Sequence, residues 1–324
     1  MSARKPWLSG IFTEAVRANC FGYDVKKFVD FKSTNDKSRT AQFSSVVEFG
    51  EVTLEKKTSK LVVQPVLIKT QIRAVYPPPA TSIDMFHNEV LFYTKVLPLL
   101  QKYDTCNVLS TSFPEIVCGK AVGKPEEDIV VLKDLRRKGF QPCGDPEGLD
   151  EKHIELVLDR LGKFHALSFI CRLENPMGFE EVTSQMRELD YAEAVSAFGG
   201  FLTKEGGHFS RNRTIAKRTR VSRKADRSSC ELQGGAYDLM NKYMYGSRDS
   251  GVIFHGDYRL DNMMFKYEAD GTPIEVVFFD VQTICIGSPA IDICRFMIFV
   301  APTELNALAG SLFCVFILMH YQIR

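Results

Sequence analysis

Residues 255–262 read HGDYRLDN and directly follow a short apolar run, Val252–Phe254. Within this stretch, Asp257 and Asn262 have the spacing H-x-D-x-x-x-x-N. Phosphoryl transfer needs an aspartate that orients the attacking hydroxyl and accepts its proton, with an amide oxygen for Mg²⁺ nearby. A turn between the two residues lets both side chains face one phosphate. Because an isolated match of this kind can arise by chance, its interpretation depends on partners elsewhere in the chain.

Asp280 is the first such partner. It lies eighteen residues after the end of the motif and closes an apolar run, Val276–Phe279. Strands are predicted over Met263–Tyr267 and Glu275–Val281, and Asp270-Gly271 between them is a strong hairpin signal. Taken alone, Asp280 reads as a turn residue after a strand. Together with the upstream motif, it is predicted to bridge metal and phosphate.

Two charged residues occur where apolar residues are expected. Lys69 ends the apolar run Val66–Ile68. Glu89 lies on the apolar stripe of a predicted helix, between Phe86 and Tyr93. An isolated buried charge is costly, so buried charges are usually paired. If the helix packs on the sheet, Lys69 and Glu89 can pair, and the lysine then directs its ammonium to the α- and β-phosphates of ATP. The alternative is that both side chains reach solvent.

The order lysine, glutamate, H-x-D-x-x-x-x-N, aspartate is that of phosphotransferases with a protein-kinase-like fold. Strands are predicted over Phe43–Leu54, with a bulge at Gly50, and over Leu61–Thr70. A helix is predicted over Asp84–Leu100, where apolar residues recur at helical spacing.

A hinge and further helices complete the predicted elements. Ile129–Leu135 falls where a kinase-like fold has its inter-lobe hinge, whose backbone groups bind the edges of adenine. Leu132 and Asp134 are the hinge residues that we expect to contact the cofactor. Helices are predicted over Glu151–Ile170 and from near Pro289.

The predicted fold is therefore of the α+β class and has two lobes. Residues 1–132 would form a small lobe with an antiparallel β-sheet and one helix, and residues 133–324 a mainly helical lobe with the catalytic loop and the metal-binding hairpin. Within the second lobe, residues 204–227 carry nine Lys or Arg against two acids. A nucleic-acid or membrane contact is conceivable, but aromatic residues do not alternate with the basic ones. A mobile basic insertion is the favoured interpretation.

Composition excludes several classes of protein. The 324 residues are 45% hydrophobic and 25% charged, which is typical of a globular chain of one large domain or two lobes. A net charge of +1 argues against a dedicated nucleic-acid-binding protein. Nine cysteines without a C-x-x-C pair indicate a reducing compartment, and the first residues lack the apolar core of a secretory signal. We therefore expect a cytoplasmic protein.

The last residues have a different character. Leu305–Ile323 contains no formal charge, but Asn306, Gly310 and His320 interrupt its apolar residues. A buried helix is therefore favoured over a membrane span, which needs about 20 mostly apolar residues.

At this point the chain resembles the ecdysteroid kinase-like family, also called choline-kinase-like, of the aminoglycoside phosphotransferase group. The resemblance runs from about Gln42 to Phe299, and its Asp-x-Gln step at Asp280 differs from the Asp-Phe-Gly of protein kinases. The matching residues are Phe86, Glu89, Phe92, Tyr93 and Pro98, then Val131–Leu135, Phe164–Ala166, His255–Asp257 with Asn262 and Phe265, Phe279–Gln282, and Gly287–Pro289 with Asp292.

The resemblance implies ATP-dependent phosphorylation of a hydroxyl on a small molecule. It implies that Lys69 contacts the phosphates of ATP and that Glu89 orients Lys69. It further implies that Asp257 is the catalytic base and that Asn262 and Asp280 hold Mg²⁺.

Three other residues receive supporting roles from the resemblance. His255 is expected to brace the catalytic loop by hydrogen bonding rather than act as a base. Asp292 is expected to tie its helix to the catalytic loop. His165 is expected to be a core histidine or to support the site indirectly, not to be a ligand.

The chain departs from the family pattern in three places. The glycine-bearing Asn-Tyr-x-Ser loop of the family appears here as Gln42–Ser45, without glycine, and close backbone approach to phosphate usually uses glycine. The basic segment 204–227 does not read like the family's helical middle. Family members also continue beyond the helix that holds Asp292, so the helices that complete the acceptor pocket are expected to be missing or replaced here.

Two function classes stay open from the sequence. The first is a kinase acting on an alcohol, with an ecdysteroid-like steroid, a choline-like amine or a xenobiotic alcohol as acceptor. The second is an inactive or weakly active binding protein with a kinase fold, because of the shortened C-terminus. A membrane-tethered kinase rests on the final apolar stretch alone, and no stable membrane span is expected.

Overall fold

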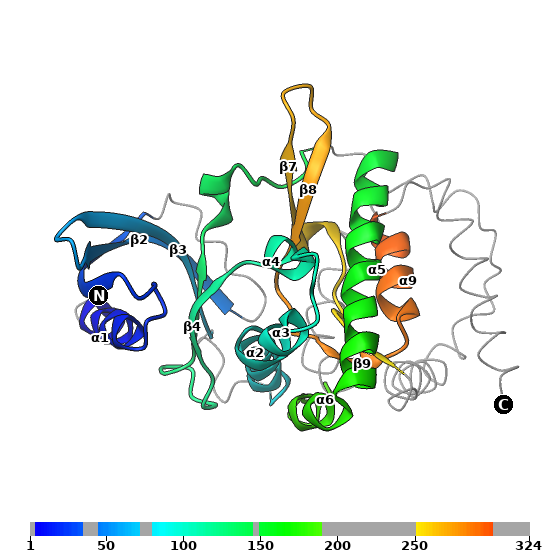
Figure 1. The fold of residues 1–324 in the computed structure, drawn as a ribbon, viewed down its shortest axis with the longest axis horizontal. Coiled ribbons are helices and arrows are strands. Elements are labelled where there is room, and N and C mark those ends of the chain that lie inside the picture. Colours follow the sequence, from blue (N-terminus) through cyan, green and yellow to red (C-terminus); the bar gives the residue numbers. More distant parts are fainter. Residues whose placement is uncertain (1–3, 35–44, 72–79, 145–148, 190–250, 301–324) are drawn as a thin grey trace, which may run out of the picture.

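The computed structural model describes residues 4–34, 45–71, 80–144, 149–189 and 251–300 of the chain. Its N-terminal part is a five-stranded antiparallel sheet with the strand order β1-β2-β3-β5-β4 (Figure 1). The strands are β1 (Val25–Ser33), β2 (Ser45–Lys56), β3 (Leu61–Gln71), β4 (Ile116–Lys120) and β5 (Ile129–Lys133).

The β2–β3 pairing corrects one expectation. Its register runs from Ser45 opposite Gln71 to Glu55 opposite Leu61 without a shift, so the bulge predicted at Gly50 is absent from this pair. The glycine instead makes room for Phe31 of β1, because a Cβ on Gly50 would lie 2.2 Å from Cε2 of that ring. The change in apolar phase along β2 reflects burial on both faces of the strand, not an extra residue.

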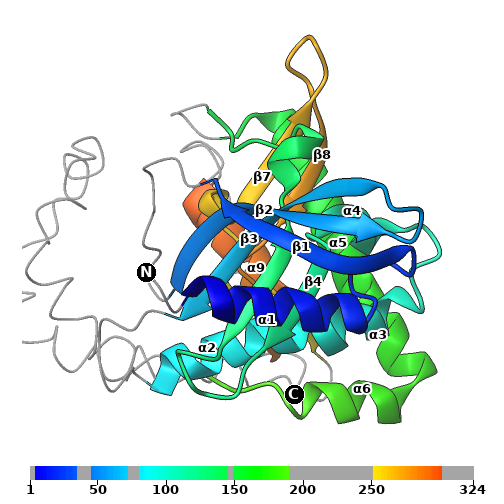
Figure 2. The same ribbon diagram turned by 90° about the vertical axis from the view of Figure 1, so that its left-hand side faces the viewer.

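The outer face of the sheet is covered by a helix that sequence patterning did not predict. α1 (Arg4–Arg17) buries Leu8 and Phe12 against β1 and the outward-facing residues of β2, β3 and β5. Figure 2 shows α1 lying along this face, beside the strands. The weak patterning of the first 40 residues therefore conceals both a helix and the first strand.

The predicted helix over residues 84–100 is present as a continuous helical segment. It consists of α2 (Ala80–Leu91), a π-helical turn (Phe92–Val96) and α3 (Leu97–Gln101). The widened turn precedes Pro98, which has no N–H to donate to the carbonyl of Thr94. Within that turn, the N–H of Leu97 bonds to the carbonyl of Phe92, five residues back. The segment packs its apolar side against Val130 and Leu132 on the inner face of the sheet.

The remaining elements are mainly helical. It contains α4 (Val108–Ser112), α5 (Glu151–Glu174), α6 (Pro176–Thr183) and α9 (Ala290–Val300), and α5 and α9 lie side by side in Figure 1. Two small antiparallel pairs accompany the helices. They are β6 (Val252–Phe254) with β9 (Cys285–Gly287), and β7 (Met263–Tyr267) with β8 (Pro273–Phe278).

The hairpin predicted around Asp270-Gly271 is confirmed. Strands β7 and β8 pair in antiparallel register, and Gly271 has the positive φ, 88°, that such a turn needs. The second strand ends at Phe278, earlier than predicted, so Asp280 lies beyond the strand and not within it.

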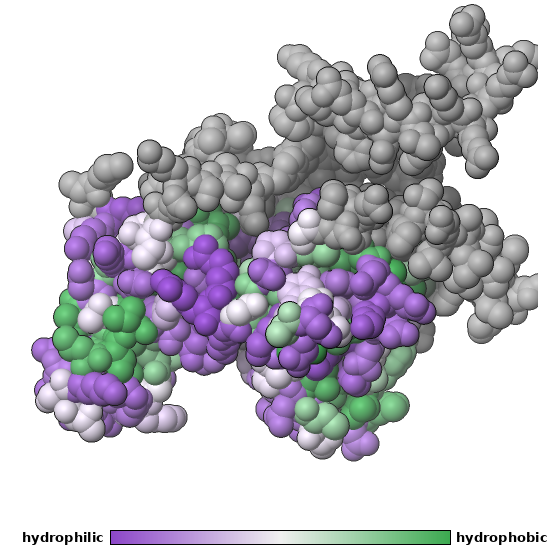
Figure 3. All heavy atoms as spheres, turned by 90° about the horizontal axis from the view of Figure 1, so that it is seen from above, coloured by the Kyte–Doolittle hydropathy of each residue, from purple (hydrophilic) through white to green (hydrophobic). Residues whose placement is uncertain are grey.

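The two-lobed arrangement expected from the sequence is present. In the view of Figure 3, the described surface forms two masses with a notch between them, and hydrophilic side chains border the notch. The basic segment 204–227 and the apolar stretch Leu305–Ile323 lie outside the described residues. Within the described ranges, no helix combines the length and the apolar character that crossing a membrane requires.

Candidate functional site

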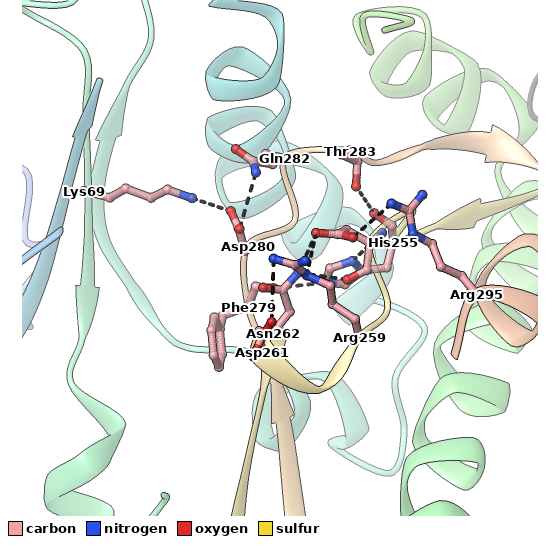
Figure 4. A network of polar contacts seen from close by, with 11 residues as sticks. Lys69, His255, Arg259, Asp261, Asn262, Phe279, Asp280, Gln282, Thr283 and Arg295 are labelled. Atoms are coloured by element: carbon pink, nitrogen blue, oxygen red, sulfur yellow. Dashed lines mark hydrogen bonds and ion pairs between the residues drawn. The ribbon is translucent and has the colours of Figure 1, made fainter. Parts of the chain in front are cut away.

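Lys69 joins the two lobes through its ammonium group. Nζ lies 2.7 Å from Oε2 of Glu89, on α2. It also lies 2.5 Å from Oδ1 of Asp280, after β8, and Figure 4 shows this second contact. The side chains of Lys69 and Glu89 are only 4% and 2% exposed. The structure therefore brings together three predicted site residues that lie far apart in the sequence, and the alternative in which Lys69 and Glu89 reach solvent is wrong.

Burial makes this cluster electrostatically strong. Burial alone would lower the pKa of Lys69, but the carboxylates of Asp280 and Glu89 outweigh it and raise the pKa above its usual value. Burial raises the pKa of Glu89, and the nearby charge of Asp280 adds to that rise against the effect of Lys69. One ammonium faces two carboxylates, so the cluster is suited to a further cation.

Tyr93 lies beside this cluster. Burial, together with the charges of Glu89 and Asp280, holds the pKa of its phenol well above the usual value. The phenol is therefore neutral at ordinary pH, and its hydroxyl has no hydrogen-bond partner among the described residues.

The helix that carries Glu89 is fastened to the second lobe by the residue before it. Asn88 is fully buried, and its Nδ2 donates to the carbonyl of Arg187 at 2.8 Å. Its Oδ1 accepts from the N–H of Arg187 at 2.9 Å. A side-chain amide paired with a backbone amide in this way fixes the position of α2, and thereby of Glu89. The sequence analysis did not single out Asn88.

Asp280 adopts an unusual backbone conformation. Its φ of 61° lies in the left-handed region, which is uncommon for a residue other than glycine. The preceding residue, Phe279, donates its N–H to the carbonyl of Asn262 at 3.1 Å, so the loop after β8 is held beside the end of the catalytic loop. This backbone contact is what brings Asp280 next to Asn262.

The loop of residues 255–262 contains a glycine that no other residue can replace without strain. Gly256 has a φ of 80°, and a Cβ there would lie 2.5 Å from the carbonyl oxygen of Thr283. The N–H groups of His255 and Gly256 each donate to the carboxylate of Asp292 at 2.8 Å. The turn is therefore fixed from two sides, directly before Asp257.

Asp257 and Asn262 meet as the motif spacing predicts. Nδ2 of Asn262 lies 2.9 Å from both the backbone carbonyl and Oδ2 of Asp257. The turn between them is a short 3-10 helix, Leu260–Asn262. Because the amide nitrogen is used inside the loop, the amide oxygen of Asn262 is the atom that this residue can offer to a cation.

The hydrogen bonds of His255 define its protonation. Its Nδ1 accepts from the N–H of Asp257 at 3.3 Å, so the ring proton is on Nε2, which donates to the carbonyl of Phe279 at 3.0 Å. Both nitrogens of the neutral ring are engaged within the protein. This geometry is that of a brace between the catalytic loop and the loop of Asp280.

Asp292 is the second brace. It is fully buried at the start of α9, and besides the two loop N–H groups it faces Nε2 of His165 at 3.0 Å. Burial alone would raise the pKa of Asp292. The hydrogen bond and charge of His165, together with the hydrogen bond from the N–H of Gly256, outweigh burial and lower the pKa. His165, on α5, thus contacts the site indirectly.

Two arginines that the sequence analysis did not single out flank Asp257. Nη2 of Arg295, on α9, lies 3.1 Å from Oδ1, and Nε of Arg259, in the catalytic loop, lies 3.4 Å from Oδ2 (Figure 4). The sequence could have indicated the contact of Arg259 with Asp257, since Arg259 is a cation inside the motif. The sequence indicated the contact of Arg295 less clearly, since the distance of Arg295 from Asp257 depends on how α9 packs.

The two residues expected at the hinge lie in β5 and directly after its end. Leu132 is paired with Leu67 of β3, and the N–H of Asp134 bonds to the carbonyl of Pro65 at 3.1 Å. The carboxylate of Asp134 accepts from the N–H and the guanidinium of Arg136, which lies in the 3-10 turn Leu135–Lys138. The side chain of Asp134 is therefore occupied within the protein.

Arg136 in turn covers an aromatic ring. Its guanidinium carbon lies 3.4 Å from the ring centroid of Phe49, on β2. Because paired residues of an antiparallel sheet point to the same side, and Val47 is paired with Lys69, Phe49 shares the face of the sheet that carries Lys69. The sequence analysis missed this pair, since nothing local connects residues 49 and 136.

The donor set at Asp280 and Asn262 fits a magnesium–nucleotide complex. Carboxylate and amide oxygens are ligands that Mg²⁺ prefers, and this ion usually takes only one or two carboxylates and completes its shell with water and phosphate. Within the part of the chain that the structure describes, no cluster of three or more His, Cys, Asp or Glu side chains forms a ready-made metal site. The two oxygen ligands therefore suit an ion that arrives with a nucleotide.

Comparison with known proteins agrees with this geometry. The model of the ecdysteroid kinase-like family matches residues 40–311, which is most of the chain. A search among curated proteins found no match. The matched range includes all of the residues described above in this site.

Proposed function

Because the chain belongs to the ecdysteroid kinase-like family, we propose that it transfers the γ-phosphoryl group of Mg·ATP to an alcohol hydroxyl of a small molecule. The observation that carries this proposal is the buried cluster of Lys69, Glu89 and Asp280 beside the Asp257–Asn262 loop. A fixed cation at Lys69, oxygen ligands on Asp280 and Asn262, and a carboxylate on Asp257 for the hydroxyl are what phosphoryl transfer requires of a protein.

On the donor side, we assign the phosphate contact to Lys69. Its ammonium is held by Glu89 and Asp280 and stays charged, because its pKa is raised. A fixed positive charge at the α- and β-phosphates orients the nucleotide and balances part of its charge without rearrangement during the reaction.

We assign the base of the nucleotide to the inner face of the sheet, at the hinge. The half-buried Phe49 and Leu67 offer apolar surface there, and we assign the edge of adenine to the backbone at Leu132 and Asp134. Arg136 lies over Phe49 and provides a flat cationic surface for the ring system.

For the metal, Asn262 and Asp280 would hold Mg²⁺ through their side-chain oxygens. The ion would supply positive charge at the β- and γ-phosphates. In this chain the brace through His255 and the bond from Phe279 to Asn262 keep the two ligands in register.

On the acceptor side, we assign the orientation of the hydroxyl to Asp257. Asn262 and two arginines hold its carboxylate, so it is fixed before a substrate arrives. The acceptor oxygen forms a bond to the γ-phosphorus while the bond from that phosphorus to the bridging oxygen of ADP breaks. The hydroxyl proton passes to Asp257. The proposed acceptor class is small alcohols, with steroid alcohols of the ecdysteroid type first among them.

We further propose that the reaction takes place in the cytoplasm. Cys20, Cys106, Cys118, Cys143, Cys171 and Cys294 are free thiols, which suits a reducing compartment.

A screen of alcohols tests the proposed function. The chain is incubated with Mg·ATP and a panel of ecdysteroids, choline-like amino alcohols and simple xenobiotic alcohols, and each product is examined for the mass gain of one phosphate. We expect at least one alcohol to gain it in a Mg²⁺-dependent way, and Asp280→Asn to abolish the gain.

Asp159→Asn is the matched control, since this exposed aspartate of α5 is paired with Lys163 and lies in no part of the site. If ATP binds but no alcohol gains a phosphate and no ATP is consumed, the chain is a nucleotide-binding protein and not a kinase.

A further inference from the structure

The two guanidinium groups at Asp257 are not equivalent. Arg295 contacts Oδ1 at 3.1 Å, whereas Arg259 contacts Oδ2 at 3.4 Å and the carboxylate of Asp261 at 3.9 Å. The side chain of Arg259 is 49% exposed, against 33% for Arg295 and 15% for Asp257. Arg259 is thus the more loosely bound and the more accessible of the two cations.

The two sides of the site differ in how firmly their cations are held. At Lys69, one cation faces the two carboxylates of Glu89 and Asp280. At Asp257, Arg259 and Arg295 face one carboxylate, and the other carboxylate near Arg259, that of Asp261, is 80% exposed and 3.9 Å away, so the guanidinium of Arg259 is a weakly held cation where the acceptor hydroxyl meets the γ-phosphoryl group. A neutral alcohol gains little from such a charge. The phosphoryl group gains much, because its transition state spreads negative charge over three equatorial oxygens.

We propose that Arg259 is a further catalytic residue, which binds the oxygens of the γ-phosphoryl group during transfer. This inference rests on the proposed kinase function. In the step already given, the acceptor oxygen bonds to the γ-phosphorus, the bridging oxygen leaves with its electron pair on ADP, and the hydroxyl proton goes to Asp257. Arg259 exchanges its long contact with Asp257 for the charged phosphoryl oxygens and gives up no proton.

The position of Arg259 in the loop supports this role. It lies between Asp257 and Asn262, the residues assigned to the hydroxyl and to the metal, and its N–H groups form a planar fork that matches phosphate oxygens. Arg295 is fixed on α9 and holds Asp257 from the other side. One arginine therefore positions the carboxylate, and the other faces the group that is transferred.

Nucleotide discrimination tests this assignment without depending on turnover. The affinities of wild type, Arg259→Gln, Arg259→Lys and Arg295→Gln for Mg·ATP and Mg·ADP are measured by titration calorimetry. Arg259→Gln is expected to weaken Mg·ATP binding at least about fivefold and to leave Mg·ADP within about twofold, since only ATP carries the γ-phosphoryl group. Arg259→Lys retains the charge but not the fork. Its affinity for Mg·ATP is expected to lie between those of wild type and Arg259→Gln. Arg295→Gln is expected to leave the discrimination intact.

Transfer rates provide the second readout. Arg259→Gln is expected to lower the rate of phosphate transfer about a hundredfold. The control is Arg17→Gln, at an exposed arginine of α1 on the outer face of the sheet, which is expected to behave as wild type. Arg259→Gln protein that discriminates ATP from ADP as well as wild type does would overturn the assignment, and so would equal loss of discrimination in Arg295→Gln.

The results also separate this assignment from the proposed function. If the wild type binds neither nucleotide, both the proposed kinase function and the role of Arg259 are wrong. Wild type that transfers phosphate, with Arg259→Gln unchanged in discrimination and rate, removes only the role of Arg259. If Arg259→Gln keeps its discrimination but loses affinity for acidic alcohols, the charge serves an anionic acceptor and the assignment to the phosphoryl group is wrong.

Discussion

Lys69 and Asp280 are 211 positions apart in the chain and form an ion pair with 2.5 Å between Nζ and Oδ1. The lysine belongs to β3 of the N-terminal sheet, and the aspartate follows the β7–β8 hairpin of the second lobe. Glu89 completes the contact from α2 at 2.7 Å. The ion pair thus holds the two lobes together at the point where the proposed reaction takes place.

Replacement of Lys69 should affect both activity and stability. Lys69→Met leaves two buried carboxylates without their cation, so we expect the free energy of unfolding to fall by about 3 kcal/mol in chemical denaturation. Phosphate transfer should fall by about a thousandfold, because the fixed charge at the phosphates is lost.

Two comparisons make the Lys69 prediction specific. Lys163→Met, at an exposed lysine paired with Asp159, should change stability by less than about 1 kcal/mol. Adding Glu89→Gln to Lys69→Met should recover part of the stability, since it removes one of the stranded carboxylates. A Lys69→Met protein as stable and as active as wild type would show that the cluster has no such role.

Phe49 should contribute to nucleotide binding. Phe49→Ala removes the ring that supports the Arg136 guanidinium and part of the apolar surface assigned to the base, so it should weaken Mg·ATP binding about tenfold in titration calorimetry. Phe169→Ala, at a residue of α5 that is 41% exposed, should leave the affinity unchanged. Equal affinities for wild type and Phe49→Ala would place the base elsewhere.

Gly256 should tolerate no side chain. Gly256→Ala forces a residue with a Cβ into a φ of 80° and against the carbonyl of Thr283, so we expect a loss of about 3 kcal/mol in stability and a large loss of transfer activity. The control is Gly162→Ala in the middle of α5, where a Cβ meets no atom within 4 Å. That change should stabilise the protein by about 0.5–1 kcal/mol, and similar effects of the two substitutions would contradict the description of the loop.

The lowered pKa of Asp292 predicts that the stability of the protein depends on pH. Its pKa in the folded protein lies below the ordinary value of 3.8, so its stabilising effect is fully present above about pH 4 and is lost as the pH falls through the lower folded value. Asp292→Asn should therefore cost about 3 kcal/mol at pH 7, and the difference from wild type should shrink towards pH 3.

Urea unfolding of the two Asp292 proteins across this pH range measures the difference. Asp159→Asn is again the control and should change stability by less than about 0.5 kcal/mol throughout. A difference between wild type and Asp292→Asn that is constant between pH 7 and pH 3 would show that the ionised carboxylate does not support the loop.

The parts of the site that the sequence predicted are those with a local signature. The spacing of Asp257 and Asn262 predicted their contact, and the turn signal at Asp270-Gly271 predicted the hairpin before Asp280. Lys69 was detectable because a charge closes an otherwise apolar strand. Whether these residues perform the assigned chemistry stays a prediction.

The parts that the sequence did not predict depend on long-range packing. α1 has weak apolar periodicity, because burial of Leu8 and Phe12 is decided by the strands beneath them. The change of phase at Gly50 was interpreted as a bulge, but only the ring of Phe31, from another strand, explains the glycine. Arg295 reaches Asp257 through the packing of α9, and Asn88 reaches Arg187 across 99 positions.

The most direct test of the account follows the labelled γ-phosphoryl group of ATP in wild type and Asp257→Asn, with Mg·ATP binding measured on the same preparations. The account predicts that wild type moves the label to an alcohol, and that Asp257→Asn binds Mg·ATP with unchanged affinity but transfers at least about a hundredfold more slowly. Equal transfer by the two proteins, or no transfer by wild type to any alcohol while Mg·ATP is bound, would contradict it.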